Sequence, residues 1–437
     1  MLLKKHDNRE LSEISKILSD VQIPVFQKIK YNFPNEKIDD IPAAIRKALE
    51  REGTLDRITP GSTVAITGSS REINEAALIM KTVVDALKEK GAKPFIVPGM
   101  GSHGGATAEG QKSILEHYGI TEEAMGVPVI SNMETVDVGT TEDGLTVRID
   151  KEAYNADFII PMGRIKQHPE FSGKYESGIM KMMAIGLGKQ HGAEVCHKYG
   201  MAAMPENIRK FGEVILQNCN IVFGIGIIET AGHGTHMIVA IPAEKIAEEE
   251  PALLQHAKSL VPVIPFEKAD VLVCEIMGKD ISGTGMDSTI IGRSISMGVS
   301  RPYFERITVF DLTDKSAGNF NGTGLCDCIT RRIFDKMEFE VTYPNSITAS
   351  ETHSAMIPLV LDTDELCVRL CLRTCTQATG EGMRVVWIKD TLSVGEMYVS
   401  EALIEEAKNN PVLTVLDGKY TPVFNEKGEY VEFKGVD

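Results

Sequence analysis

The side chains best suited to chemistry gather between residues 164 and 186, where a histidine and a lysine follow a short apolar run. His168 stands in a stretch rich in cations, and Lys181 stands between Met180 and Met182. An amine beside apolar groups is pushed toward its neutral, nucleophilic form. The same pattern also fits a surface lysine whose aliphatic stem covers a methionine-rich helix.

Two further histidines have settings that suggest chemistry. His197 follows Lys181 by sixteen positions, and His103 lies in the glycine-rich run 99–105. Imidazole titrates near neutral pH, so it can act as an acid, a base or a metal ligand. Glycines let a backbone approach a ligand closely, and the start of the helix expected after His103 favours an anion. The alternatives are a packed or surface histidine at 197 and a tight strand-to-helix turn around 103.

The elements that position these residues alternate between strand and helix. Apolar, β-rich runs at 63–67 and 94–97 predict strands, and helical spacing predicts helices at 76–87 and 107–117. This order predicts parallel strands with helices on their faces. Loops with functional residues lie at the carboxyl ends of such strands, so we expect the segments 69–71 and 101–104 to lie close together.

The later part of the chain predicts a second unit. Strand patterns recur at 158–160, 221–228 and 271–274, and a segment with two prolines at 260–265 resembles a linker. We therefore expect two α/β domains with mostly parallel sheets and an active site in the cleft between them. Residues 1–264 form the cofactor-binding domain and 265–394 the second domain, with 395–437 packing back on the first.

Composition excludes several classes of function. The net charge of −16 disfavours a nucleic-acid groove and an anionic membrane surface, while a small anionic substrate still fits a pocket with a few cations. No targeting segment and no membrane span is visible. The eight cysteines show no disulfide spacing, which favours the cytoplasm, and Cys367, Cys371 and Cys375 fit one buried helix face.

Taken together, these motifs resemble the nickel-dependent lactate racemase family and its hydroxyacid racemase and epimerase relatives. The resemblance rests on the order and spacing of short motifs, with two further blocks in the second domain. The motifs are Ser70-Arg71, Gly101-Ser102-His103-Gly104, His168 with Phe171-Ser172-Gly173, Lys181 with Gly186, and the sequence spacing from Lys181 to His197. The further blocks are residues 278–287 and 318–322.

The resemblance implies a nickel-pincer nucleotide, a pyridinium-3,5-bisthiocarboxylic acid mononucleotide that carries nickel. It implies that His197 ligates the nickel and that Lys181 forms a covalent tether to the cofactor. His103 and His168 correspond to the acid/base pair. The other implied contacts are Ser70, Arg71, Gly101 and Gly104 with the cofactor, and Arg71 or Lys279 with the substrate carboxylate.

This chain departs from the lactate racemases at several points. It is longer between His168 and Lys181, where Lys174-Tyr175-Glu176 is inserted, and Gly104 stands where those enzymes carry an arginine. A larger hydroxy acid, such as a dicarboxylate or a sugar acid, is therefore expected as much as lactate.

The expected function is that of an isomerase, a racemase or epimerase of a 2-hydroxy acid. It would work by reversible hydride transfer from the substrate α-carbon to the cofactor, with histidine acid/base catalysis. Its partners would be the hydroxy acid and the enzymes that mature the cofactor, and a homo-oligomer is compatible with the sequence. Two alternatives remain open: a divalent-metal hydrolase or lyase that uses the same histidines, and a non-catalytic binder of the cofactor or a small acid.

Overall fold

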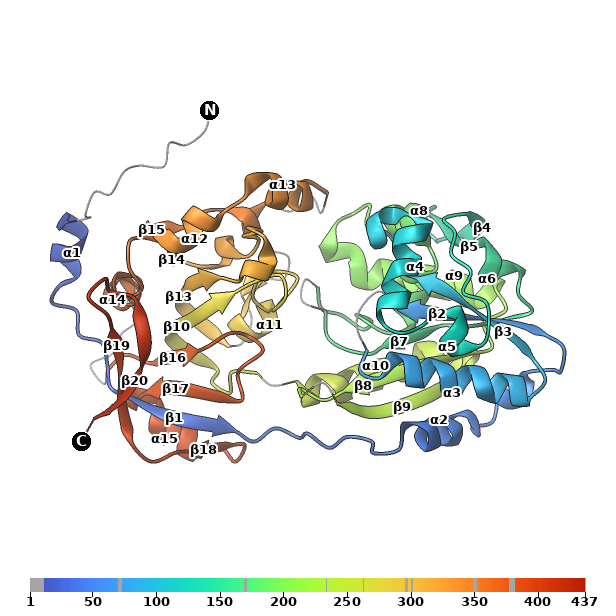
Figure 1. Ribbon diagram of the computed structural model, residues 1–437, viewed down its shortest axis with the longest axis horizontal. Coiled ribbons are helices and arrows are strands. Elements are labelled where there is room, and N and C mark those ends of the chain that lie inside the picture. Colours follow the sequence, from blue (N-terminus) through green and yellow to red (C-terminus); the bar gives the residue numbers. More distant parts are fainter. Residues whose placement is uncertain are drawn as a thin grey trace. The chain divides into compact units, whose positions relative to one another are not determined.

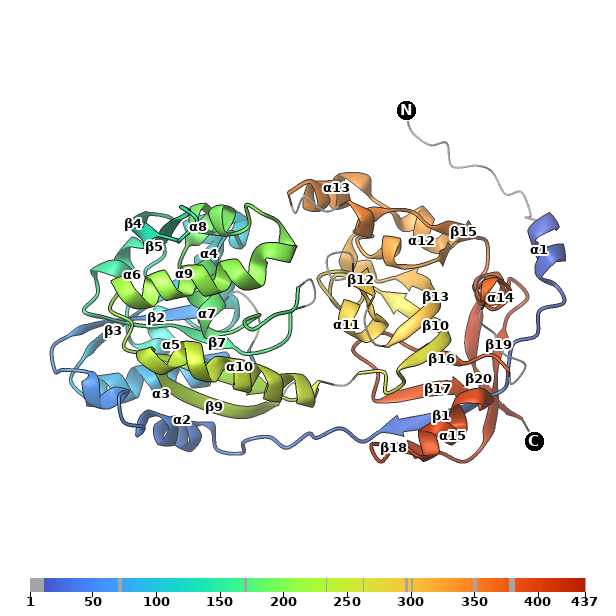
Figure 2. The ribbon, with the colours of Figure 1, turned by 180° about the vertical axis from the view of Figure 1, so that it is seen from behind.

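A computed structural model describes residues 12–436, except 70–72, 169–170, 233, 262, 295–297, 300–301, 349–351 and 377–381. The chain divides into two compact units, which Figures 1 and 2 show from opposite sides. We call Pro34–Val261 the central unit, and the described residues within Met1–Phe33 and Pro262–Asp437 the terminal unit. No helix among the described residues has the length and apolar character needed to cross a bilayer.

The central unit contains two three-stranded sheets, β3-β2-β6 and β7-β8-β9, and a separate pair, β4-β5. Strand β2 pairs in parallel with β3 and β6, and β7 pairs in parallel with β8, which pairs antiparallel with β9. Its strands are β2 (Thr63–Ser69), β3 (Lys93–Gly99), β4 (Thr135–Thr140), β5 (Thr146–Asp150), β6 (Phe158–Ile160), β7 (Met162–Arg164), β8 (Phe223–Glu229) and β9 (Thr235–Pro242). Its helices are α2 (Ile41–Leu49), α3 (Ala76–Glu89), α4 (Ala108–His117), α5 (Glu122–Met125), α6 (Lys151–Asn155), α7 (Ile179–Lys181), α8 (Lys189–Cys196), α9 (Met204–Asn218) and α10 (Ala243–Leu260).

Helices cover both faces of the β3-β2-β6 sheet. Along β2, Val64 and Ile66 belong to the core that contains α3, whereas Ala65 between them belongs to the core that contains α9. This alternation follows from the two-residue period of a strand, and burial on both faces explains the nearly continuous apolar run. The strand and helix order expected between residues 60 and 130 is confirmed.

The terminal unit is built on one ten-stranded sheet of mixed direction. Its strand order is β15-β14-β13-β10-β16-β17-β1-β19-β20, and β18 pairs with β1. The strands are β1 (Phe26–Tyr31), β10 (Lys268–Met277), β13 (Tyr303–Leu312), β14 (Cys328–Thr330), β15 (Leu359–Leu361), β16 (Val385–Ile388), β17 (Glu396–Ser400), β18 (Leu413–Val415), β19 (Lys419–Phe424) and β20 (Tyr430–Val436), with a small separate pair β11 (Arg293–Ser294) and β12 (Gly298–Val299). The helices are α1 (Ser12–Leu18), α11 (Ser288–Ile291), α12 (Arg331–Lys336), α13 (Phe339–Thr348), α14 (Asp364–Thr374) and α15 (Ile404–Lys408).

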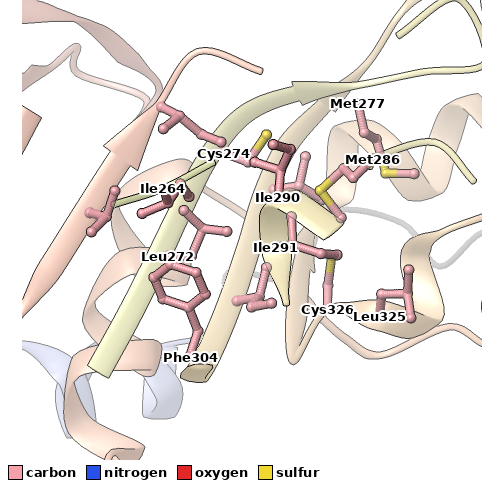
Figure 3. Close-up of a cluster of buried hydrophobic side chains, with 14 of the residues drawn as sticks. Ile264, Leu272, Cys274, Met277, Met286, Ile290, Ile291, Phe304, Leu325 and Cys326 are labelled. Atoms are coloured by element: carbon pink, nitrogen blue, oxygen red, sulfur yellow. The ribbon is translucent and has the colours of Figure 1, made fainter. Parts of the chain in front are cut away.

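The parallel half of that sheet runs from β15 to β16, and the other strands pair antiparallel. Side chains of β10 and β13, such as Leu272 and Phe304, pack with α11 in a fully apolar core (Figure 3). The α/β class is therefore confirmed, with parallel portions in both units rather than sheets that are parallel throughout.

One expected domain assignment does not match the strand pairing. The segment 395–437 was expected on the first domain, but β17 pairs with both β16 and β1, and β19 pairs with β20 and β1 of the terminal unit. Residues before Pro34 also join this unit through β1. The periodicity of a strand reveals its exposed and buried faces but not its partner, which is set by non-local hydrogen bonding. The second crossing between the units lies at Val261, beside the two-proline segment.

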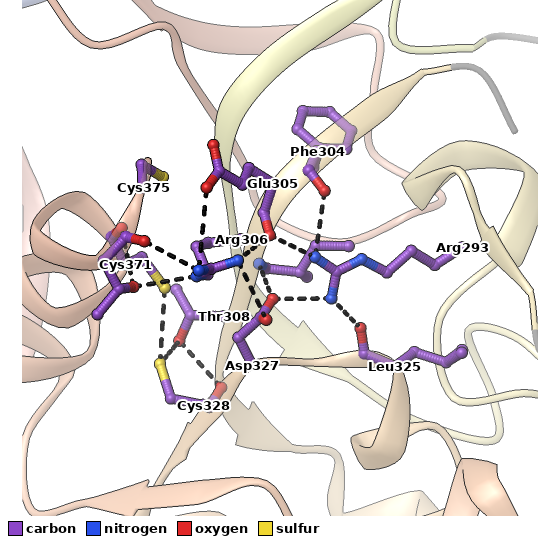
Figure 4. Close-up of polar contacts among 12 residues, drawn as sticks. Arg293, Phe304, Glu305, Arg306, Thr308, Leu325, Asp327, Cys328, Cys371 and Cys375 are labelled. Carbon is purple, nitrogen blue, oxygen red and sulfur yellow. Dashed lines mark hydrogen bonds and ion pairs between the residues drawn. The ribbon is translucent and has the colours of Figure 1, made fainter. Parts of the chain in front are cut away.

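Arg293 fastens the connection after α11 to the parallel strands. Its guanidinium donates to the carbonyl oxygens of Leu325 and Phe304 at 3.0 and 3.1 Å, and it pairs with Asp327 at 2.7 Å (Figure 4). Asp327 also accepts the backbone N–H of Ile307 at 2.8 Å. Each charge thus has several partners, as a half-buried ion pair requires.

The cysteines of α14 pack as small apolar groups. Cys367 and Cys371 are fully buried, and the sulfur of Cys371 lies 3.6 Å from that of Cys328 (Figure 4). Cys375 is half-buried against the same core. Core packing of this helix face is therefore confirmed.

A close approach between two glycines fixes the loop after β3. Gly104 has a φ of +65°, and a Cβ built there would lie 2.6 Å from the backbone N of Gln111 in α4. A Cβ on Gly110 would lie 1.9 Å from the carbonyl oxygen of Gly104. The loop can rest on the first turn of α4 only because both residues lack a side chain.

Helix α10 carries a buried carboxylate. Glu250 is 1% exposed, and its Oε2 accepts the N–H of Met180 at 2.9 Å. Burial raises the pKa of Glu250 to about 7, although the backbone donors of Met180 and Ile179 act against the rise. This carboxylate therefore docks α7, the short helix that ends in Lys181, onto α10.

We expect Gly110→Ala to lower the free energy of unfolding by about 1–3 kcal/mol, because the added methyl overlaps the Gly104 carbonyl. The measurement is calorimetric unfolding of the full chain. Gly192→Ala is the matched control, since it is also a helix glycine but its Cβ would lie 3.4 Å from the nearest atom. The control should be neutral or stabilising by up to about 1 kcal/mol. Equal losses in the two variants would contradict the close approach.

We expect Glu250→Gln to change how stability depends on pH. The pKa of Glu250 is about 7 in the folded chain against an ordinary 4.5, so the folded state binds more protons between these values. Its contribution to the free energy of unfolding is thus full below pH 4.5 and falls as pH rises toward 7. From pH 5 to pH 8 the wild type should lose about 3 kcal/mol relative to the variant.

Urea unfolding at the two pH values measures that difference. Glu249→Gln is the control on the neighbouring residue, because pairing with Arg51 lowers the pKa of Glu249. This control keeps Glu250, and a lowered pKa at Glu249 gives the wild type no stability to lose as pH rises, so the wild type should lose nothing relative to this control between pH 5 and pH 8. A gap between wild type and Glu250→Gln that does not change with pH would contradict a raised pKa.

Candidate functional site

Three loops with expected site residues follow the carboxyl ends of parallel strands in the two sheets of the central unit. The loop after β2 carries Ser70 and Arg71, which lie outside the described residues. The loop after β3 carries His103, and β2 and β3 end opposite each other, with Ser69 paired to Gly99. The loop after β7 carries His168, and β7 is joined to β2 through Thr67, whose hydroxyl accepts the N–H of Met162 at 2.8 Å. The loops after β2 and β3 thus start side by side, and the expected closeness of Ser70 and Arg71 to the His103 loop stays a prediction.

His168 and Lys181 both lie against the aromatic ring of Phe171. The imidazole of His168 stacks on Phe171 with ring centroids 4.0 Å apart and planes inclined by 19°. The Lys181 Nζ lies 5.4 Å from the centroid of the same ring. Phe171 is 2% exposed, so it gives both residues a rigid apolar support.

His197 lies at the end of α8 with its tautomer defined by the backbone. Its Nδ1 lies 2.6 Å from the carbonyl oxygen of Ala193, and a carbonyl can only accept, so Nδ1 carries the hydrogen. Nε2 of the neutral ring therefore keeps its lone pair, which is the form that binds metals. Burial lowers the pKa of His197, the Ala193 bond opposes this, and the charge of Lys181 lowers it further.

That last effect places Lys181 electrostatically close to His197. The Lys181 charge also acts on the thiol of Cys196, whose pKa burial raises to about 12. The structure thus brings together His168, Lys181 and His197, three of the residues expected from the sequence. Their elements follow one another along the chain as a loop, α7, a π-helical segment (Met182–Gly186) and α8. Short π-helical turns recur at functional sites.

The His103 loop rests on that π-helical segment. Gly101 has a φ of +56°, its N–H donates to the carbonyl of Gly186 at 3.2 Å, and a Cβ there would lie 3.1 Å from Ile185. His103 is exposed two residues further on. Gly104 has no room for a side chain, because it packs against the backbone of α4. Its expected contact with a cofactor stays a prediction.

Sequence reasoning missed the buried charges that hold these loops. Lys189 and Asp150 are both 0% exposed and their charged atoms lie 2.9 Å apart. The Lys189 Nζ donates to the carbonyl of Pro98 at 2.7 Å, just before the His103 loop, and Gln111 Nε2 donates to the carbonyl of Gly101 at 2.9 Å. Burial lowers the pKa of Lys189, and Asp150 opposes this effect. The residue type gives no local signal of such burial, because lysine is mostly exposed.

Glu229 ties two segments beside these loops together. It forms an ion pair with Arg164 at the end of β7, and its Oε1 accepts the N–H of Asn74 at 2.8 Å. Asn74 follows the loop with Ser70 and Arg71, and Arg164 precedes the loop with His168. The 6% exposed Glu229 side chain therefore fixes the ends of both loops.

Lys279 belongs to the terminal unit, in the loop that follows β10. Its N–H donates to Ser316 Oγ at 2.9 Å and its Nζ to the carbonyl of Gly283 at 2.5 Å. Like the other loops, it lies at the carboxyl end of a parallel strand. Its expected role toward the substrate stays a prediction.

A metal site made by protein side chains alone needs at least three converging ligands. In the part of the chain that the structure describes, no three His, Cys, Asp or Glu side chains form such a group. The alternative, a divalent-metal hydrolase or lyase, would need at least three such ligands around one ion. A cofactor that brings its own metal donors needs only one protein ligand, which His197 can supply.

Comparisons with known proteins support one family. Residues 12–222 match the model of the lactate racemase N-terminal domain. The lactate racemase apoprotein from Thermoanaerobacterium thermosaccharolyticum is a similar solved structure, with 14% sequence identity and a TM-score of 0.46, over 84% of this chain and 89% of that chain. No curated protein sequence matches the chain. Residues 12–222, which contain the site motifs, are thus a domain of the lactate racemase N-terminal type.

Proposed function

We propose that this protein is a racemase or epimerase of a 2-hydroxy acid that depends on the nickel-pincer nucleotide. The observation that carries the proposal is the placement of His168 and Lys181 against Phe171, together with His197, whose charge state Lys181 affects and whose Nδ1 is bound to the Ala193 carbonyl. The match to the lactate racemase N-terminal domain supports an isomerase of the racemase type. The finer statements below are ours.

The residues present fit such a cofactor. His197 offers a lone pair on Nε2 and stays neutral because burial lowers its pKa, as a nickel ligand should. Lys181 offers an amine beside an aromatic ring for the covalent tether. Ser70, Arg71, Gly101 and Gly104 would line the remaining cofactor contacts. When bound, the cofactor supplies a hydride acceptor that can return the hydride to either face of the oxidised substrate.

The chain's own residues would move the proton of the hydroxyl group. A base must take this proton as the alcohol becomes a 2-keto acid, and it must give the proton back on reduction. His103 and His168 lie on loops that follow the parallel strands β3 and β7, and we assign them to the two faces of the substrate. Each imidazole would then serve one enantiomer.

The substrate would be a small anion. Arg71 or Lys279 would pair with its carboxylate, since planar guanidinium binds carboxylate in a bidentate way. We propose lactate or a larger hydroxy acid, such as a dicarboxylate or a sugar acid, as the substrate class. The enzymes that mature the cofactor would be partners in the cytoplasm, and a homo-oligomer is compatible with this function.

We expect nearly one nickel per chain when the protein is produced together with the maturation enzymes, and a loss of most of it in His197→Ala. The reason is that the Nε2 of His197 is the proposed protein ligand. Elemental analysis after gel filtration measures the ratio. His191→Ala is the matched control, because His191 is an exposed histidine on the same helix. Nickel absent from the wild type, with a known family member loaded in parallel, would refute the proposal.

We expect His103→Ala and His168→Ala to keep their nickel and to lose about 10²–10⁴-fold in kcat, which is the usual contribution of a general acid or base. Chiral chromatography of a panel of hydroxy acids follows the reaction, with elemental analysis on the same samples. Full activity in either variant at full nickel content would remove that histidine from the proposed pair.

A further inference from the structure

The loop that carries His168 is closed at its base and filled by one carboxylate. Lys166 and Ser177 exchange backbone hydrogen bonds of 3.1 and 3.2 Å, which closes the loop. Inside it, Glu176 Oε2 accepts the N–H of His168 at 2.7 Å. Oε1 accepts the N–H of Gly173 and the hydroxyl of Ser172, each at 3.1 Å. Both oxygens of one side chain therefore define the path of the loop.

This carboxylate is removed from water and carries a counterion. Glu176 is 1% exposed, and Lys258 Nζ of α10 lies 2.6 Å from its Oε1. A buried charge needs both a partner charge and hydrogen bonds to its remaining lone pairs, and Glu176 has both. Such a group tolerates little displacement, because every shift leaves a lone pair without a donor.

The neighbouring Tyr175 binds a backbone carbonyl of α10 that lacks its usual hydrogen-bond partner within the helix. Pro251 lies inside α10 and has no N–H, so the carbonyl oxygen of Ala247 lacks its usual partner four residues later. The hydroxyl of Tyr175 donates to that oxygen at 2.6 Å. The 1% exposed Tyr175 ring thus completes a helix hydrogen bond that the sequence of α10 leaves open.

Three contacts therefore join one face of α10 to the segment between His168 and Lys181. Ala247 binds Tyr175, Glu250 binds Met180, and Lys258 binds Glu176. The three residues of α10 recur at helical spacing and so lie on one face. Two of the three held residues, Tyr175 and Glu176, are neighbours in the chain.

We propose that Glu176 is a positioning residue for His168, and that its pair with Lys258 anchors the His168 loop to α10. The proposal rests on the proposed function in so far as His168 moves the substrate proton. Glu176 holds the backbone N–H of His168, while Phe171 holds the imidazole. A base that shifts by about 1 Å loses its alignment with the hydroxyl group, which can cost up to about 100-fold in rate.

Glu176→Gln in the full-length, cofactor-loaded protein tests this. One carboxylate oxygen becomes an amide NH2 group, which cannot accept a hydrogen bond. Either the N–H of His168, or the N–H of Gly173 and the ammonium of Lys258, then loses its acceptor, so the loop must open on one side. We expect kcat to fall about 10–100-fold, with KM and nickel per chain unchanged. Hydrogen exchange, read by mass spectrometry, should speed up in the peptide that spans residues 165–177.

A second variant separates positioning from simple loss of structure. Glu176→Gln with Lys258→Met removes the ammonium that the new NH2 would face, so kcat should recover in part over the single variant. Glu249→Gln is the matched control, since it breaks a 2.6 Å ion pair on the same helix with Arg51, away from the His168 loop. It should leave kcat and the exchange of 165–177 unchanged.

The outcomes decide the proposal separately from the proposed function. Unchanged kcat in Glu176→Gln at full nickel content overturns it, and so does a fall in kcat that only follows a loss of nickel or of folded protein. Should the wild type racemise no hydroxy acid, the proposed function fails. Exchange in residues 165–177 then still decides whether Glu176 fixes this loop, and unchanged exchange overturns the positioning role.

Discussion

The ion pair between Asp150 and Lys189 is the contact on which the loops of the central unit depend most. Both side chains are fully buried, so removing either one would leave the other charge without compensation, at a cost of about 3–5 kcal/mol. Asp150 also caps α6 through the N–H of Ala153, and Lys189 holds the carbonyl of Pro98. Lys189 even adopts a left-handed backbone with a φ of +52°, which costs about 1–2 kcal/mol and which the surrounding contacts enforce.

The same physical rule recurs at each of these loops. Glu229 with Arg164 holds the ends of two loops, Glu176 with Lys258 binds the backbone of one of these two, and Lys189, paired with Asp150, holds the start of the His103 loop. Loops are usually mobile, yet catalytic groups need fixed positions. Buried carboxylates fix the loops, because they accept hydrogen bonds from backbone N–H groups that lie outside helices and strands.

The sequence predicts what local periodicity encodes, and little beyond it. The alternation of β2, α3, β3 and α4 follows from apolar spacing. By contrast, the pairing of β1 with β17 joins residues far apart in the chain, and no local pattern specifies it. Glu176 and Lys189 were overlooked for a related reason: their roles arise from burial, which a charged residue type argues against.

Pro251 shows how a local defect can serve the whole fold. For α10 alone, alanine at this position would stabilise the helix, because alanine is a good helix former and its N–H restores the missing hydrogen bond. That restored bond would occupy the oxygen to which Tyr175 is fastened. Selection for a more regular helix and selection for a fixed His168 loop thus act in opposite directions at one residue. Consensus design that scores each helix separately would choose the wrong amino acid here.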